Sequence, residues 1–111
     1  MKPPAFVPAP GDVVWLNFDP QAGHEQGGHC LAVVLSPVGY NGKTGLMVCC
    51  PLTTRIKGYP FEVPVGGMPA SVVLADQVKN LDWRARGAER KGRVSERESA
   101  EIRGKLRALV G

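Results

Sequence analysis

Short apolar runs rich in β-branched residues, separated by glycine, proline and asparagine, make up most of this chain before residue 95. Five of these runs have the length of strands rather than helices: residues 12–18, 31–37, 45–52, 61–65 and 71–78. In the fourth run, Pro64 has no backbone N–H, which confines that run to the edge or the end of a sheet. We therefore expect a strongly bent antiparallel sheet or a small barrel.

Two connections between the expected strands carry turn residues. Asn41 and Gly42 tolerate the positive φ that a tight reversal needs, so residues 38–44 predict a hairpin between the second and third runs. Residues 21–29 hold three glycines and little apolar surface, which predicts an exposed, mobile loop.

The C-terminal segment carries a helical pattern. Ser95 and Glu98 have the spacing of a capping box at a helix N-terminus. The apolar residues that follow recur at helical spacing: Ile102, Leu106, Leu109 and Val110. The sequence thus predicts a mainly β fold with one C-terminal amphipathic helix.

The length of the chain suits a single domain. Because one hydrophobic core needs about 100 residues, we expect one domain spanning residues 1–111. A hydrophobic content of 43% with 22% charged residues excludes a disordered or fibrous chain. The net charge of +4 weakly favours anionic partners such as nucleic acid.

The N-terminus and the cysteines indicate a cellular compartment. Four prolines within the first ten residues leave no apolar stretch for secretion or membrane insertion, so we expect a cytoplasmic protein without a membrane role. The chain has three cysteines, and Cys49 and Cys50 are adjacent in an expected strand, where their side chains point to opposite faces. Reduced thiols are the expectation.

Metal and nucleotide motifs are missing from the sequence. There is no Cys-x-x-Cys or His-x-x-x-His pair, and His24 and His29 share a glycine-rich loop without thiolates. Neither the P-loop pattern nor the dinucleotide-binding glycine pattern occurs. The prediction is a protein without a metal or cofactor.

The basic segment 84–93 is a candidate nucleic-acid contact. It holds five cations and one acid, Trp83 adjoins it, and Arg55 and Lys57 add positive charge from another loop. Proteins that bind single-stranded nucleic acid combine cations with aromatic rings in this way. A solvated surface is the structural alternative.

Three further positions have both a chemical and a structural interpretation. Thr53 and Thr54 follow an expected strand, where a hydroxyl can reach a ligand. The structural alternative is that two β-favouring threonines simply end the strand. Glu25 is either a general base or a solvated acid in the glycine-rich loop. Cys30 starts an apolar run, which by itself indicates a small core residue.

Seven blocks, taken in order, resemble one known family. The blocks GDVVWLNFDP, EQGGH, AVVLSP, YNGKTG, TTRIKGYPFEV, LADQVK and WRARGA span nearly the whole chain. Together they resemble the MazF/PemK mRNA interferase toxins of type II toxin–antitoxin systems. The resemblance implies an SH3-like barrel of the CcdB/MazF type, a homodimer, and metal-independent cleavage of single-stranded mRNA. It also implies a cognate antitoxin with an acidic C-terminal tail that covers the RNA groove.

The resemblance also implies roles for individual residues. Thr53 matches the family's catalytic hydroxyl, and Glu25 matches the loop beside the reacting ribose. The positions expected to line the RNA groove are Phe18, Lys57, Gln77 and Arg86.

One position departs from the family pattern. The family reads Gly-His-Arg-Pro before the AVVLSP block, whereas this chain reads Gly28-His29-Cys30-Leu31. Cys30 therefore stands where the family has its catalytic arginine, and a thiol lacks the permanent charge and the rigid fork of a guanidinium. Loss of one such stabilising group costs about 10²–10³-fold in rate. A cloning or engineered origin and a naturally silent paralogue are competing accounts of this change.

Two other functions compete with an active endoribonuclease. Cys30 favours a catalytically dead module that binds antitoxin or RNA. A DNA-gyrase poison of the same fold ranks lower, because the blocks EQGGH, TTRIKGYPF and LADQVK resemble the RNA-cleaving branch.

Overall fold

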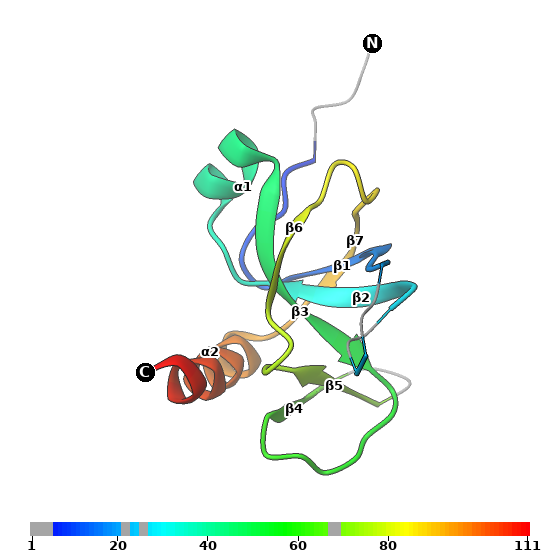
Figure 1. The fold of residues 1–111 in the computed structure, drawn as a ribbon. Helices are drawn as coiled ribbons and strands as arrows, with labels where there is room; N and C mark the ends of the chain where they lie inside the picture. Colours follow the sequence, from blue (N-terminus) through cyan, green and yellow to red (C-terminus); the bar gives the residue numbers. More distant parts are fainter. Residues whose placement is uncertain (1–5, 21–22, 25–26, 67–69) are drawn as a thin grey trace.

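A computed structural model describes residues 6–20, 23–24, 27–66 and 70–111 (Figure 1). Within these ranges the chain forms seven strands and two helices. The strands are β1 (Asp12–Asn17), β2 (His29–Val34), β3 (Leu46–Thr53), β4 (Glu62–Val65), β5 (Ser71–Leu74), β6 (Lys79–Asp82) and β7 (Glu89–Arg93). The helices are α1 (Val38–Thr44) and α2 (Glu96–Val110).

Strand β3 connects the two parts of the sheet. The order is β4-β5-β3-β2-β1-β7, with β6 also paired to β3, and all of these pairings between the described strands are antiparallel. Residues Leu46–Cys49 pair with β6, whereas Leu52 and Thr53 pair with β5 on the other part of the sheet. Pro51, which has no N–H, falls between these two pairings, where a missing donor interrupts neither of them.

The core has two clusters on opposite faces of the strands. Cys49 packs in one cluster with Leu16 and Phe18, whereas Cys50 packs in the other with Val33 and Ile102 of α2. In Figure 1, α2 lies at the β4–β5 end of the sheet and packs against β4. The opposite orientation of the adjacent cysteines is confirmed, and all three cysteines are free.

The mainly β architecture and the C-terminal helix are also confirmed. The hydroxyl of Ser95 accepts a hydrogen bond from the Glu98 N–H at 3.1 Å, and the Glu98 carboxylate accepts one from the Ser95 N–H at 2.8 Å. These bonds form the predicted capping box, and the hydrogen bonds that the Glu98 carboxylate accepts from the Ser95 and Gly66 N–H groups lower its pKa. As predicted, β4 with Pro64 is an edge strand. Neither helix in the described ranges is long and apolar enough to span a membrane.

The predicted antiparallel pairing of the second and third runs is confirmed by β2 and β3, but the predicted tight turn at Asn41-Gly42 is wrong, because residues 38–44 form helix α1. The positive φ occurs instead at Gly45, which ends the helix with a φ of 73°. The Asn41 side chain is fully buried, and its amide donates to the carbonyls of Pro8 and Ser36 at 2.8 and 3.0 Å. The bond to Pro8 joins residues 33 positions apart, so it stabilises this conformation through a contact that local turn preference does not include.

The sequence pattern also missed β6 and β7, because both strands are short and mostly polar. The cations of the basic segment 84–93 also make contacts within the protein. Arg84 stacks over Trp83 at 4.7 Å, and Arg86 donates to the carbonyls of Asn17 and Asp19. Arg90 and Arg93 both pair with the buried Asp12, and Lys91 pairs with Glu89. All five cations of the segment therefore have intramolecular partners.

We expect Asn41→Leu to destabilise the protein by about 2–4 kcal/mol, because it leaves buried carbonyls and the Ser36 hydroxyl without their partner. Urea denaturation at one protein concentration measures the change. Asn80→Leu is the matched control, since Asn80 is exposed and, within the described part of the chain, its side chain donates a hydrogen bond to the exposed Tyr40 hydroxyl rather than to a buried carbonyl. Equal stability of the two variants would contradict this role for Asn41.

Candidate functional site

The ends of β2 and β3 bring two predicted site positions together. In the pairing of β2 with β3, Ala32 faces Pro51, Val33 faces Cys50, and Val34 faces Cys49. If this register is continued by two residues beyond the last pair, Cys30 is aligned with Thr53. Both residues line the same hollow, which places them at one edge of the sheet.

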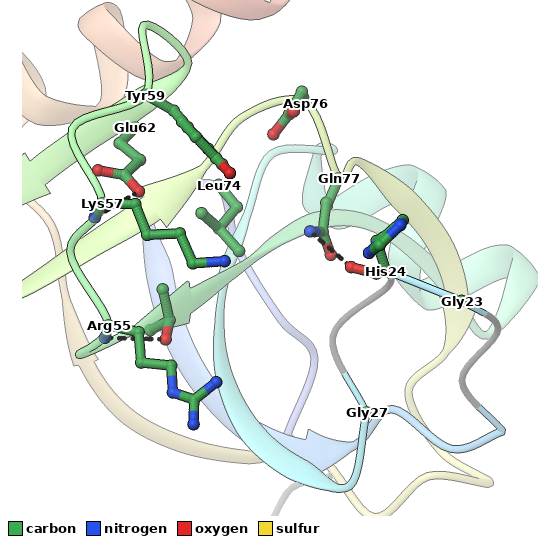
Figure 2. Close-up of a pocket in the computed structure, with 11 residues that line it drawn as sticks. Gly23, His24, Gly27, Arg55, Lys57, Tyr59, Glu62, Leu74, Asp76 and Gln77 are labelled. Carbon is green, nitrogen blue, oxygen red and sulfur yellow. Dashed lines mark hydrogen bonds between the residues drawn. The ribbon is translucent and has the colours of Figure 1, made fainter.

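The first of two hollows at this edge, the cationic hollow, has a volume of about 330 Å³ (Figure 2). Its lining comes from the β1–β2 connection, the β3–β4 connection and the β5–β6 turn: Gly23, His24, Gly27, Thr53, Arg55, Lys57, Tyr59, Glu62, Leu74, Asp76 and Gln77. Figure 2 shows Lys57 on one side of this space, with Gln77 and His24 on the other. The Gln77 amide donates to the His24 carbonyl at 3.4 Å, which joins two of these segments.

A buried carboxylate fixes the loop that carries the cations. Glu62 is 6% exposed and accepts hydrogen bonds from the N–H groups of Lys57 and Gly58 at 3.1 and 2.9 Å. Lys105 of α2 donates to the carbonyls of Pro60 and Glu62. The backbone at Lys57 is therefore held, while its exposed ammonium group lies 5.6 Å from the centre of the Tyr59 ring. This arrangement presents the Lys57 ammonium group to the hollow, whose lining also includes Arg55 and the carboxylates of Glu62 and Asp76.

The second hollow, the aromatic hollow, has a volume of about 220 Å³. It is lined by Trp15, His29, Cys30, Leu31, Leu52, Thr53, Thr54 and Ser71. The rings of Trp15 and His29 are stacked, with centroids 5.9 Å apart and planes inclined by 28°. Thr53 lines both hollows and so stands between a cationic and an aromatic surface.

The Thr53 hydroxyl oxygen accepts a hydrogen bond from the Arg55 N–H at 3.1 Å. Accepting this bond orients the hydroxyl and leaves its own proton for donation to an anionic ligand. A phosphate fits this chemistry, because its oxygens can accept hydrogen bonds from the Thr53 hydroxyl and from the cationic side chains of Arg55 and Lys57, which line the same hollow.

Cys30 is buried in the core beside Leu16 and Phe18. Burial raises the pKa of its thiol to about 11, and the negative charge of Asp19 adds to the effect. The residue is therefore a neutral thiol at pH 7, which agrees with the interpretation of Cys30 as a small core residue. It gives neither positive charge nor a strong hydrogen-bond donor to the edge it shares with Thr53.

The remaining predicted positions lie in different places. Lys57 and Gln77 line the cationic hollow, whereas the Arg86 guanidinium holds the end of β1 through two carbonyls. Phe18 is 1% exposed in the core, so its ring is not presented to either hollow. Glu25 lies outside the described residues.

Sequence reasoning did not single out Trp15, His29 or Tyr59 as site residues. Strand alternation could have indicated Trp15. Its neighbours Val14 and Leu16 are fully buried, and successive side chains of a strand point to opposite faces, so Trp15 points away from the core. No comparable signal marks Tyr59, whose place depends on the fold of the β3–β4 connection. Among the described residues, no group of three or more His, Cys, Asp or Glu side chains could hold a metal ion.

The chain resembles characterised toxins in sequence and in structure. Residues 9–110 match the family described as PemK-like, MazF-like toxin of type II toxin–antitoxin system. The endoribonuclease toxin MazF of Escherichia coli strain K12 is 53% identical over 107 residues, covering 96% of each chain. A crystal structure of MazF from Deinococcus radiodurans aligns with a TM-score of 0.92 at 55% identity, covering 96% of this chain and 99% of that chain. A chain of a MazE–MazF crystal structure from the same organism aligns with a TM-score of 0.85 at 48% identity, covering 96% and 98%.

We expect Cys30 in the native protein to react with a thiol-specific disulfide reagent at pH 7.5 at least about 100-fold more slowly than a free thiol, because its raised pKa leaves little thiolate. The rate should increase with pH until the pH approaches about 11. Peptide mapping identifies the modified residue. In the chain unfolded by urea, all three thiols should react promptly with the reagent. Rapid modification of Cys30 at pH 7.5 would show that the thiol is not buried as described.

Proposed function

The chain belongs to the PemK-like, MazF-like family of toxins from type II toxin–antitoxin systems, and from this membership we propose that it is an endoribonuclease toxin that acts on single-stranded RNA without a metal ion. The observation that carries the proposal is the position of Thr53, whose oriented hydroxyl lies beside the cations of the β3–β4 connection. A hydroxyl donor and positive charge at one edge suit a ribose–phosphate backbone.

In the proposed reaction, the ribose 2′-hydroxyl loses its proton as its oxygen attacks the adjacent phosphorus, and the 5′-oxygen leaves and takes up a proton. The products are a cyclic phosphate and a 5′-hydroxyl, and DNA is not cleaved because it lacks the nucleophile. Negative charge grows on the phosphate oxygens, where the Thr53 hydroxyl donates a hydrogen bond and Arg55 and Lys57 supply positive charge. Glu25 is the proposed neighbour of the reacting ribose, and Gln77 is a further proposed RNA contact.

The neutral Cys30 thiol weakens this chemistry more than it weakens binding. The cationic hollow does not include Cys30, so positive charge for an RNA backbone is independent of that residue. At the reacting phosphate, however, this chain has a neutral thiol where an arginine would provide a positive charge and paired hydrogen-bond donors. We propose that this chain binds RNA and cleaves it slowly.

Two protein partners complete the proposal. MazF of Deinococcus radiodurans crystallises in a complex with MazE, and we propose that this chain likewise binds a cognate antitoxin whose acidic C-terminal tail occupies the RNA surface. Carboxylates can take the place of phosphates against Arg55 and Lys57. A homodimer is also proposed, which would cover exposed apolar side chains such as Val38 and Val110. The proposed site of action is the cytoplasm, where mRNA is found.

Cys30 also favours a second candidate function, a module that binds antitoxin or RNA without cleaving either. This alternative needs the same cationic hollow but no reaction at the phosphate. A long RNA incubated with the chain and EDTA separates the two functions, since the enzyme must leave some cut ends.

We expect the double substitution Cys30→Arg, Leu31→Pro to increase RNA cleavage by about 10²-fold or more, because it returns a preorganised charge to the position aligned with Thr53. Primer extension on a long RNA in the presence of EDTA measures the rate and the cut sites. Adding Thr53→Val to the double variant should remove most of the gain, and a 2′-deoxy nucleotide at the cut site should abolish cleavage. The mechanism is wrong if the doubly substituted protein cuts no single-stranded RNA.

We expect Lys57→Gln to weaken binding of a short single-stranded RNA and to reduce the slope of log affinity against log salt concentration by about one. Titrations at several salt concentrations measure both quantities. Lys91→Gln is the matched control, because Lys91 pairs with Glu89 on β7 and lines neither hollow. An equal effect of both substitutions would place the RNA elsewhere on the protein.

A further inference from the structure

Trp15 is an exposed aromatic side chain within a strand. It is 38% exposed, although Val14 and Leu16 beside it are fully buried. Strand alternation directs Trp15 away from the core cluster that holds those two neighbours. The other tryptophan, Trp83, is 6% exposed and donates its indole N–H to the Asn41 carbonyl at 2.9 Å. The two tryptophans therefore differ in accessibility, and the packing of the core does not account for the exposed one.

The position of Trp15 is held by pairing on both sides. Its backbone pairs with Leu31 of β2 and with Glu89 of β7, and its ring stacks on His29. A ring fixed in this way loses little conformational entropy when a flat ligand stacks on it. Nucleobases are such ligands, and proteins that bind single-stranded RNA hold unstacked bases on aromatic side chains.

Thr53 lies between the hollow that contains the Trp15 ring and the hollow proposed to hold the reacting phosphate. It lines the cationic hollow with Arg55 and Lys57, and it lines the aromatic hollow with Trp15 and Thr54. In a nucleotide the phosphate and the base project from the ribose in different directions. An RNA strand whose phosphate contacts Thr53 can thus direct one base toward the aromatic hollow and its neighbouring phosphates toward the cations.

We propose that the aromatic hollow is a subsite for one nucleobase next to the cleaved linkage, with Trp15 as the stacking surface and the Thr54 hydroxyl available at its rim. The proposal rests on the proposed function and adds a residue that determines how RNA is positioned. The volume of about 220 Å³ is below the range of pockets that hold drug-sized ligands, which suits one base rather than a longer segment. Stacking accepts any base, so selectivity at this subsite depends on hydrogen bonds from the rim.

The test uses the unsubstituted chain and a set of short single-stranded RNAs, each with one abasic nucleotide at a different position. Slow cleavage allows equilibrium titrations. Loss of a stacked base or of its aromatic partner costs about 1–3 kcal/mol, so Trp15→Ala should weaken binding by about 5- to 150-fold. One abasic position should weaken binding to the unsubstituted chain similarly, and should have little further effect on Trp15→Ala. Trp15→Phe should retain most of the affinity.

Two controls separate stacking from structural effects. Tyr40→Ala removes an exposed aromatic ring that lines neither hollow, and it should leave RNA affinity unchanged. Intact RNA should quench the fluorescence of exposed Trp15, whereas buried Trp83 should respond little, so a Trp15→Phe protein should lose most of the quenching.

The outcomes distinguish this inference from the proposed function. If the chain binds RNA with the expected salt dependence but Trp15→Ala and every abasic RNA bind normally, the base subsite is wrong and the proposed function stands. If abasic positions weaken Trp15→Ala and the unsubstituted chain equally, Trp15 does not stack on the base. If the unsubstituted chain binds no single-stranded RNA, both proposals are overturned.

Discussion

The pairing of β3 with three other strands is the constraint on which the site depends. Its first half bonds to β6, its middle to β2 and its end to β5, so the strand must pass from one part of the sheet to the other. Pro51 pairs with Ala32 of β2 and lies between the residues that pair with β6 and those that pair with β5, so its missing N–H removes no bond from these last two pairings. Thr53 ends the strand and consequently lies at the edge where two hollows meet. Its position is set by backbone hydrogen bonds rather than by a loop.

Positive charge in this protein is divided between structure and site. The arginines of the 84–93 segment pair with Asp12, with backbone carbonyls or with Trp83, and so stabilise the region around β1, β7 and α1. The charge directed at the cationic hollow comes from the shorter segment with Arg55 and Lys57, which the buried Glu62 holds in place. Local charge density in the sequence does not reveal which cations have intramolecular partners, so it could not separate the paired cations of the 84–93 segment from Arg55 and Lys57 at the hollow.

Binding and reaction have different requirements at this edge. An RNA backbone is attracted by any well-placed cations, whereas cleavage needs charge directed at the oxygens of one phosphate. The chain keeps the first feature in Arg55 and Lys57, but at position 30 it carries a thiol that burial keeps neutral. In the proposed mechanism this single side chain separates affinity for RNA from turnover, while the small Cys30 packs in the core cluster with Leu16 and Phe18.

Local patterns in the sequence were sufficient for the mainly β class, the edge position of Pro64 and the capping box at Ser95, because each depends on near neighbours in the chain. They were insufficient for α1, where Asn41 bonds to Pro8 across the fold, and for β6 and β7, which have little apolar pattern. At the site, sequence indicated Thr53, Lys57 and Gln77, whereas only the tertiary structure buried Phe18 and exposed Trp15 beside His29. Burial and stacking depend on which strands become neighbours, and that choice is made by contacts between residues far apart in the sequence.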